Sequence, residues 1–180
     1  MTSLRLNLTA LPTIKCRLAE HYQDIFQGEQ QQSLQREVGD FILRRKDGLI
    51  AYQLAVVVDD ISQNITHIIR GSDLLSSTPR QRYLTQLLQG QFPDYGHIPV
   101  ATNAIGQKLS KQHKAKGIDD QRAFDNVCQA LTFLHHPPPS EIVDNRNIDE
   151  LLTWATLYWQ RQNVPSAMSL VIDHIVARDS

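Results

Sequence analysis

The sequence has few residues of the kinds that build cross-linked or membrane-spanning proteins. Only Cys16 and Cys128 are cysteines among its 180 residues, and neither takes part in a CxxC motif. This scarcity favours a reducing compartment and argues against a metal site built by local spacing. The longest uninterrupted apolar run, Leu54–Val58, is far shorter than the roughly 20 residues that cross a bilayer. We therefore expect a cytoplasmic protein with no membrane role.

The chain also has almost no excess of charge. Its 18 Lys and Arg residues stand against 19 Asp and Glu residues, so the formal net charge is -1 at pH 7. Bulk attraction cannot bring a polyanion to this protein, and a contact with nucleic acid must use a local basic patch. Hydrophobic residues make up 41% of the chain, enough for one compact domain or for a domain with a small appendage.

Short β-branched segments alternate with turns in the first part of the chain. Ile50–Val58 is typical of a buried strand, and Thr66–Gly71 predicts a second strand that ends in an arginine and a glycine. Thr78–Gln81 has the form of a capping box that opens a helix, and His97–Val100 predicts a third strand. This order is part of a nucleotide-binding α/β pattern, in which ligands lie beyond the strand ends.

The remainder of the chain predicts helices. Apolar residues recur at helical spacing over 123–134, Asn147–Glu150 caps a second helix, and Pro165 begins a third. The predicted fold class is therefore α/β, with the change to helices near residues 112–119. The predicted organisation is a poorly assigned segment over 1–25, a partial Rossmann-type catalytic domain over 26–116 and a helical C-terminal region over 117–180.

A basic loop is the sharpest local feature of the sequence. Lys108 and Lys111 flank Leu109 and Ser110, Gln112 follows them, and a glycine begins the loop. A lysine ammonium on a loop can follow the charge that develops on a phosphate, so the loop favours phosphate transfer or adenylation. A lysine pair of this kind is also common on solvated surfaces, and the surrounding sequence must decide.

The loop and its neighbours resemble the class I aminoacyl-tRNA synthetases of the glutamyl and glutaminyl group, whose KMSKS-type loop takes the form KLSK. Segments that match this family in order lie at 39–48, 51–60, 67–75, 77–81 and 93–99. The resemblance runs from Phe26 to Leu134 and implies a Rossmann-type catalytic domain. Within the family, the chain is most similar to the short glutamyl-queuosine tRNA(Asp) synthetases, because little sequence follows the loop.

That resemblance implies that L-glutamate is activated with ATP, accompanied by Mg²⁺, and then transferred to queuosine in the anticodon of tRNA(Asp). It assigns glutamate binding to Tyr52 and Arg70, and it makes Lys111 the catalytic lysine of an ATP-binding loop over 108–112, with Lys108 as a second basic contact. An arginine fork can hold a carboxylate through two hydrogen bonds, and a tyrosine hydroxyl can bond the same amino acid.

Other polar residues near these segments receive no catalytic role. We expect Asp59 and Asp60 to cap the turn after the predicted strand, because adenylation needs positioning and charge stabilisation more than proton transfer. We interpret His67 and His97 as packed histidines.

Two parts of the family pattern have no counterpart in the sequence. The HIGH-type motif that binds ATP and the cysteines that bind zinc both precede the matching region, and Cys16 has no partners at the required spacing. We therefore expect no metal site and a C-terminal portion of an enzyme that is inactive alone, and we expect a monomer. The alternatives are a truncated glutamyl-tRNA synthetase and a non-catalytic remnant that binds tRNA or a partner.

Overall fold

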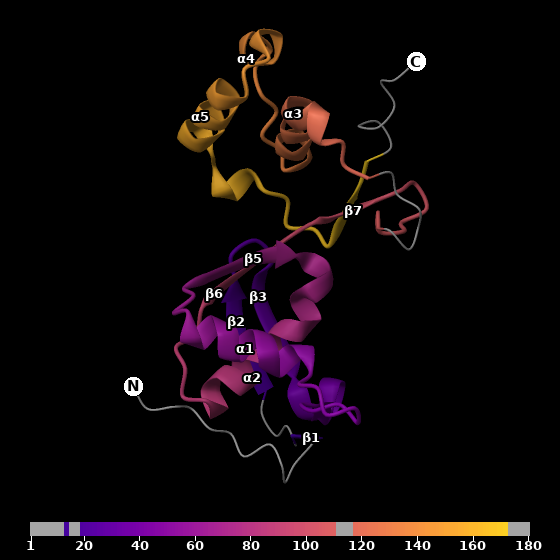
Figure 1. Ribbon diagram of the computed structural model, residues 1–180, viewed down its shortest axis with the longest axis vertical. Coiled ribbons are helices and arrows are strands. Elements are labelled where there is room, and N and C mark those ends of the chain that lie inside the picture. Colours follow the sequence, from indigo (N-terminus) through magenta and orange to yellow (C-terminus); the bar gives the residue numbers. More distant parts are fainter. Residues whose placement is uncertain (1–12, 15–18, 111–116, 173–180) are drawn as a thin grey trace. The chain divides into compact units, whose positions relative to one another are not determined.

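The computed structural model describes residues 13–14, 19–110 and 117–172 (Figure 1). The chain forms two compact units, Met1–His97 and Ile98–Ser180, which are described separately below. The boundaries predicted from composition, with the change near residues 112–119, stay a prediction. No helix within the described ranges is long and apolar enough to cross a membrane.

Paired strands form the framework of the first unit. β1 (Thr13–Ile14) pairs antiparallel with β4 (Phe41–Ile42), and β2 (Ala19–Asp24) pairs antiparallel with β3 (Gly28–Ser33). Gly28 has a φ of 74°, which suits the tight turn between β2 and β3.

A third pair brings the central part of the chain to the end of β2. β5 (His67–Gly71) pairs with β6 (Asp94–Ile98). The N–H of Ile25 donates to the carbonyl of Tyr95 at 2.8 Å, which joins the end of β2 to β6. Residues from β2, β5 and β6 therefore meet in one place.

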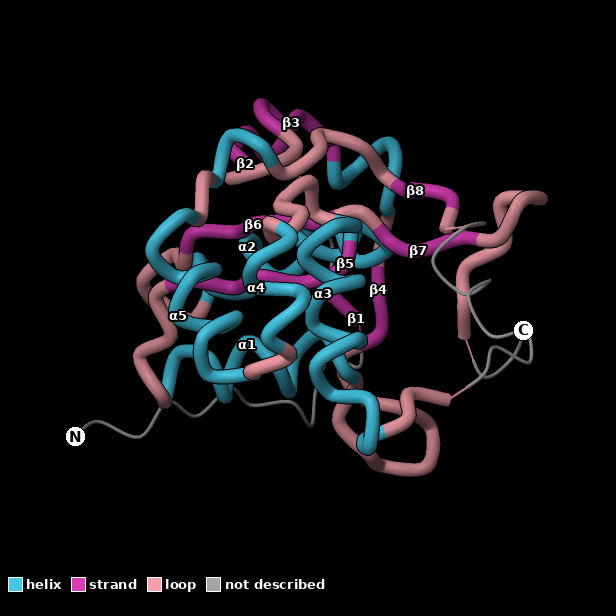
Figure 2. Tube along the Cα trace, turned by 90° about the horizontal axis from the view of Figure 1, so that it is seen from above, coloured by secondary structure: helices cyan, strands magenta, loops and turns pink. Residues whose placement is uncertain are grey.

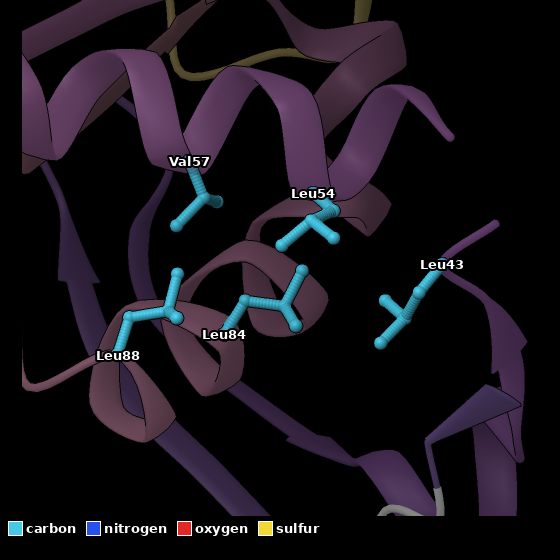
Figure 3. Close-up of a cluster of buried hydrophobic side chains, with 5 residues drawn as sticks. All are labelled: Leu43, Leu54, Val57, Leu84 and Leu88. Carbon is cyan, nitrogen blue, oxygen red and sulfur yellow. The ribbon is translucent and has the colours of Figure 1, made fainter. Parts of the chain in front are cut away.

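Two helices supply most of the apolar core of the first unit. α1 (Tyr52–Ser62) and α2 (Thr78–Leu87) face one another across buried aliphatic side chains (Figure 3). The core residues are Leu43, Leu54, Val57, Leu84 and Leu88. Burial of one such side chain contributes about 1.5–3 kcal/mol relative to its exposure, so this hydrophobic cluster contributes most of the packing energy between the two helices. Short helical turns, η1 (Leu34–Val38) and η2 (Ser72–Ser77), precede β4 and α2.

The prediction of a strand over Ile50–Val58 is wrong, because most of this segment lies in α1. Its β-branched content favours a strand, yet Leu54 and Val57 are buried while Val58 is 42% exposed. This spacing gives one helical face, which α2 covers. Tertiary packing therefore overrides the local propensity of the valines.

The helix predicted at Thr78 is confirmed, but its capping box is not. Ser77 is the N-cap, and no side chain caps the first turn. The side chain of Gln81 instead donates to Oε1 of Gln53 on α1 at 3.0 Å. A glutamine that would close a capping box on its own helix thus joins two helices.

The strand predicted over His97–Val100 is divided between two strands. β6 ends at Ile98, and β7 (Val100–Thr102) begins after Pro99. Proline has no backbone N–H, so it interrupts a ladder at this point.

The second unit combines helices with one parallel pair of strands (Figure 2). The predicted helices near 123–134 and after Asn147 are confirmed, and the Asn147 side chain accepts from the N–H groups of Asp149 and Glu150. The prediction of a helix from Pro165 is wrong, because β8 follows there and pairs with β7. The elements after β7 are η4 (Asp120–Arg122), α3 (Ala123–Phe133), α4 (Ser140–Asn145), α5 (Ile148–Tyr158), η5 (Arg161–Asn163) and β8 (Ser169–Val171).

Candidate functional site

Arg70 lies on β5, and side chains from other elements hold its guanidinium. Its Nε–H donates to Nε2 of His97 at 2.9 Å, and Nη2 donates to Oγ1 of Thr78 at 2.9 Å. A longer contact of 3.4 Å joins Nη2 to the carbonyl of Leu74. The guanidinium carbon also lies 5.3 Å from the centroid of the Tyr95 ring, within the range of a cation–π interaction. One edge of the guanidinium is therefore occupied by the protein.

His97 and Asp24 form a buried hydrogen-bonded pair behind Arg70. Both side chains are 0% exposed, and Nδ1 of His97 lies 2.5 Å from Oδ2 of Asp24. The other carboxylate oxygen, Oδ1, accepts the backbone N–H groups of Phe26, Gln27 and His97 at 3.0–3.1 Å. The carboxylate is therefore fixed by the backbone on one side and by the imidazole on the other.

These contacts determine which nitrogen of His97 carries the proton. The Nε of Arg70 can only donate, so Nε2 of His97 must accept. The remaining ring proton is then on Nδ1, where it is donated to Asp24. His97 is thus assigned as the neutral Nδ1–H tautomer, because the protonated ring would have no acceptor for Arg70.

The pKa of Asp24 agrees with an ionised carboxylate. Burial raises this pKa, whereas hydrogen bonds from the His97 side chain and from the backbone N–H groups of Gln27, His97 and Phe26 lower it, and the net effect is a lowered pKa. Burial raises the pKa of Tyr95 to about 12, although the charge of Arg70 acts against this rise. Arg70 therefore contacts a phenol and a neutral imidazole. The Asp60 carboxyl also lies within range of its charge: burial raises the pKa of Asp60, and Arg70 acts against this rise.

Tyr52 is the first residue of α1, and its side chain is 55% exposed. Its neighbour Gln53 points into the protein and donates to Oγ of Ser77 at 3.0 Å. The first turn of α1 is thus anchored through Gln53, while Tyr52 itself is exposed. Glutamate binding by Tyr52 and Arg70 stays a prediction.

A tight turn carries the first residues of the predicted ATP loop, in the second unit. Thr102 and Lys108 form an antiparallel bridge, and Asn103 closes the turn between them. The N–H of Asn103 donates to the Gln107 carbonyl at 3.0 Å, and the N–H of Gly106 donates to the Asn103 carbonyl at 2.9 Å. Gly106 has a φ of 77°, a conformation that glycine adopts at little cost.

Only part of the predicted loop lies within the described residues. Lys108 is exposed, whereas Leu109 and Ser110 are half-buried. Lys111 and Gln112 lie outside the described residues, so the catalytic role of Lys111 and its contact with ATP stay predictions.

Two of the expectations for the other polar residues are wrong. Asp59 and Asp60 lie within α1, so they do not cap a turn after a strand. The side chain of His67 is 62% exposed, so it is not a packed histidine. His97 is buried as expected, but both ring nitrogens bond polar side chains.

Sequence reasoning also missed Asp24 and Thr78, which complete the surroundings of Arg70. A polar residue at the end of a strand and a histidine within an apolar strand are the available signals. Neither identifies its partner, since Asp24 and His97 are 73 positions apart.

Metal-ligating residues do not gather in the described ranges. No group of three or more His, Cys, Asp or Glu side chains there could hold a metal ion. These residues do not fit a zinc site, and no chemical step is assigned to zinc.

The sequence is similar to those of known proteins. Residues 14–133 match a sequence model of the family described as tRNA synthetases class I (E and Q), catalytic domain. The chain belongs to this family. Family members are aminoacyl-tRNA synthetases, which are ligases, and the α/β fold class predicted from the sequence is confirmed.

Curated relatives carry a more specific name. The chain is 53% identical over 143 residues to a glutamyl-Q tRNA(Asp) synthetase of Thiobacillus denitrificans, covering 79% of this chain and 47% of the relative. A glutamyl-Q tRNA(Asp) synthetase of Pseudomonas fluorescens is 42% identical over 160 residues, covering 87% of this chain and 53% of the relative. The chain thus spans about half the length of these relatives.

A solved structure gives the same fold. The glutamate-tRNA synthetase from Elizabethkingia anophelis superposes with a TM-score of 0.66 at 19% identity, covering 88% of this chain and 35% of that chain. At this identity the likeness concerns the fold alone.

Proposed function

We propose that this chain belongs to an enzyme that activates L-glutamate with ATP and transfers it to queuosine in the anticodon of tRNA(Asp). The observation that carries the proposal is the fixed guanidinium of Arg70 in a chain 53% identical to a glutamyl-Q tRNA(Asp) synthetase. A carboxylate is the natural ligand of an arginine whose hydrogen-bond partners are neutral groups.

The geometry around Arg70 supports glutamate as the amino acid. Its Nε and Nη2 bond His97, Thr78 and Leu74, and within the described residues no hydrogen bond involves Nη1. Nη1, together with the side of Nη2 that makes only the 3.4 Å contact with the Leu74 carbonyl, forms the second edge of the guanidinium, which suits a carboxylate. Tyr52, an exposed residue at the start of α1, supplies a further polar group.

The loop at residues 108–112 is proposed to bind ATP. Lys111 stabilises the charge that develops on the phosphates, and Lys108 adds a second cation. Mg²⁺ accompanies the nucleotide as part of the substrate. In the first step the glutamate carboxylate displaces pyrophosphate from ATP, and in the second queuosine displaces AMP.

Two samples test this function: the 180-residue chain, and the same chain fused to the remaining part of the Thiobacillus denitrificans relative, here called the extended chain. We expect the extended chain to catalyse ATP–pyrophosphate exchange with glutamate but not with aspartate or glutamine. Labelled glutamate should then appear in the anticodon fragment of nuclease-cleaved tRNA(Asp), and only when that tRNA carries queuosine.

The alternatives give different results in this assay. Label on the terminal adenosine would identify a glutamyl-tRNA synthetase instead. Absence of exchange in both samples would favour a non-catalytic remnant that binds tRNA or a partner. Exchange by the 180-residue chain alone would contradict the expectation that it is inactive. Cytoplasmic location and a monomeric state also stay predictions.

A further inference from the structure

We propose that the buried Asp24–His97 pair is a positioning device that holds the Arg70 guanidinium in one orientation and so determines the affinity for glutamate. This inference rests on the proposed function, because it concerns the residue that is proposed to bind the substrate. Asp24 and His97 do not touch the ligand in this arrangement, and they act through Arg70.

The orientation of Arg70 can be followed back to the backbone bond by bond. Three backbone N–H groups at 3.0–3.1 Å fix Oδ1 of Asp24. Oδ2 of Asp24 then fixes the imidazole of His97 through Nδ1, and Nε2 of His97 fixes Nε of Arg70. Each link is a hydrogen bond between groups with little freedom to rotate, so the guanidinium plane is determined by the strands that carry it.

Each member of this series can take only one role. Arg70 donates and ionised Asp24 accepts, so His97 must donate from Nδ1 and accept at Nε2. Thr78 supports the same arrangement, since its Oγ1 accepts from Nη2 at 2.9 Å and lies 3.3 Å from Nε2 of His97. A change of the His97 tautomer would place two N–H groups against each other and release Arg70.

Occupation of the inner edge also decides how a ligand binds. With Nε committed to His97 and one side of Nη2 committed to Thr78, a carboxylate must use Nη1 and the side of Nη2 that now makes the 3.4 Å contact with Leu74. Without this arrangement the guanidinium could rotate and present either edge. Preorganisation of a binding group raises affinity by lowering the entropy lost on binding.

Asp24→Asn is the sharpest test, because it keeps the shape and changes one hydrogen-bond role. The three backbone donors need an oxygen at Oδ1, so the new amide must turn its NH₂ toward Nδ1 of His97. His97 must then accept at Nδ1 and carry its proton on Nε2, facing Arg70. We expect the glutamate KM of the extended chain to rise about tenfold or more, with the kcat and the ATP KM little changed.

Two further variants separate positioning from general damage. Thr85→Val removes a buried hydrogen bond from Thr85 to the Gln81 carbonyl on the same helix as Thr78, and it should lower the melting temperature without changing the glutamate KM. His97→Gln offers an amide oxygen to Arg70 and should keep more of the affinity than His97→Ala. In an Arg70→Ala background, Asp24→Asn should add no further rise in KM, because the residue that it positions is gone.

The ring nitrogens of His97 provide a readout that needs no activity. In the 180-residue chain, ¹⁵N spectra should show the Nδ1–H tautomer in wild type and the Nε2–H tautomer in Asp24→Asn. A wild-type Nε2–H tautomer, or an unchanged glutamate KM in Asp24→Asn, would overturn the positioning role. If wild type lacks glutamate-dependent exchange, the proposed function fails, whereas the tautomer measurement still decides whether Asp24 and His97 orient Arg70.

Discussion

Nη2 of Arg70 lies 2.9 Å from Oγ1 of Thr78, so one hydrogen bond joins strand β5 to the first residue of α2. Thr78 is completely buried, so water cannot reach its hydroxyl and take the place of the Arg70 N–H donor. The same arginine therefore stabilises the first unit and is the proposed ligand for glutamate. Substitutions of Arg70 should affect both properties.

Arg70→Lys should be poorly tolerated although it keeps the charge. A lysine ammonium cannot reach His97 and Thr78 with a planar fork and also hold a carboxylate through two bonds. We expect the glutamate KM of the extended chain to rise by a factor that corresponds to roughly 1.5–3 kcal/mol, the value of a hydrogen bond to a charged group. Exchange assays across a range of glutamate concentrations measure this change.

Arg80→Lys is the matched control for this substitution. Arg80 is half-buried and donates an exposed hydrogen bond to the Ser76 carbonyl at 2.8 Å, so its replacement by lysine should change the free energy of unfolding by no more than about 0.5 kcal/mol and leave the KM unchanged. A wild-type glutamate KM in Arg70→Lys would remove Arg70 from the proposed site.

Leu84→Ala should destabilise the first unit strongly. Leu84 is 1% exposed and packs between α1 and α2 (Figure 3), so its loss leaves a cavity that costs about 2–5 kcal/mol. Leu87→Ala, on the same helix but 46% exposed, should cost far less. Urea unfolding of the two variants measures the difference, and equal losses would contradict the described packing of α2.

The elements that the sequence predicts well are those whose signals are local. The helices near 123–134 and after Asn147 were predicted from apolar spacing and from one capping side chain, and both are present. The strand predicted over 50–58 is wrong because β-branched residues favour a strand locally. In the structure, the buried face of this segment packs against α2 as a helix. A single sequence does not reveal which distant segment covers an apolar run.

The candidate site shows the same limit. Arg70 and Tyr52 are predicted to bind glutamate only through resemblance to a family motif, which is a local pattern. The contacts between Asp24, His97 and Arg70 depend on the pairing of β5 with β6 and on the bond from Ile25 to Tyr95. These relationships are tertiary, so His97 was interpreted only as a packed histidine.

Lys111→Ala in the extended chain should slow adenylate formation and leave the glutamate KM nearly unchanged. The ammonium is proposed to act on charge that appears at the phosphates in the transition state, so kcat and kcat/KM should fall together, by about 10²-fold or more. Lys46→Ala, at an exposed position in the first unit, is the control and should not alter the exchange rate. Wild-type exchange in Lys111→Ala would exclude this lysine from the reaction.

Acid should weaken the first unit through Asp24. The folded-state pKa of Asp24 lies below its ordinary value of 3.8, so its ionised form stabilises the folded chain above that pH, and this contribution is lost as the pH falls through the folded-state pKa. Unfolding by urea at a series of acidic pH values should show a smaller dependence on pH in Asp24→Asn than in wild type. An identical dependence would mean that Asp24 titrates alike in the folded and unfolded chains.

Alkali should weaken the same unit through Tyr95, with the opposite sign. Burial raises the folded-state pKa of this phenol to about 12 from its ordinary value of 10.0, so the folded chain holds the proton more tightly than the unfolded chain. The stabilisation is complete below pH 10 and is lost as the pH rises toward 12, a loss of about 2–3 kcal/mol for two pKa units.

Tyr95→Phe keeps the ring beside Arg70 but removes the titrating group, so its free energy of unfolding should fall less between pH 9 and pH 11. Burial also raises the pKa of Tyr22, so a smaller decrease should remain in the variant. Equal decreases in wild type and Tyr95→Phe would show that the Tyr95 phenol ionises as readily in the folded chain as in the unfolded chain.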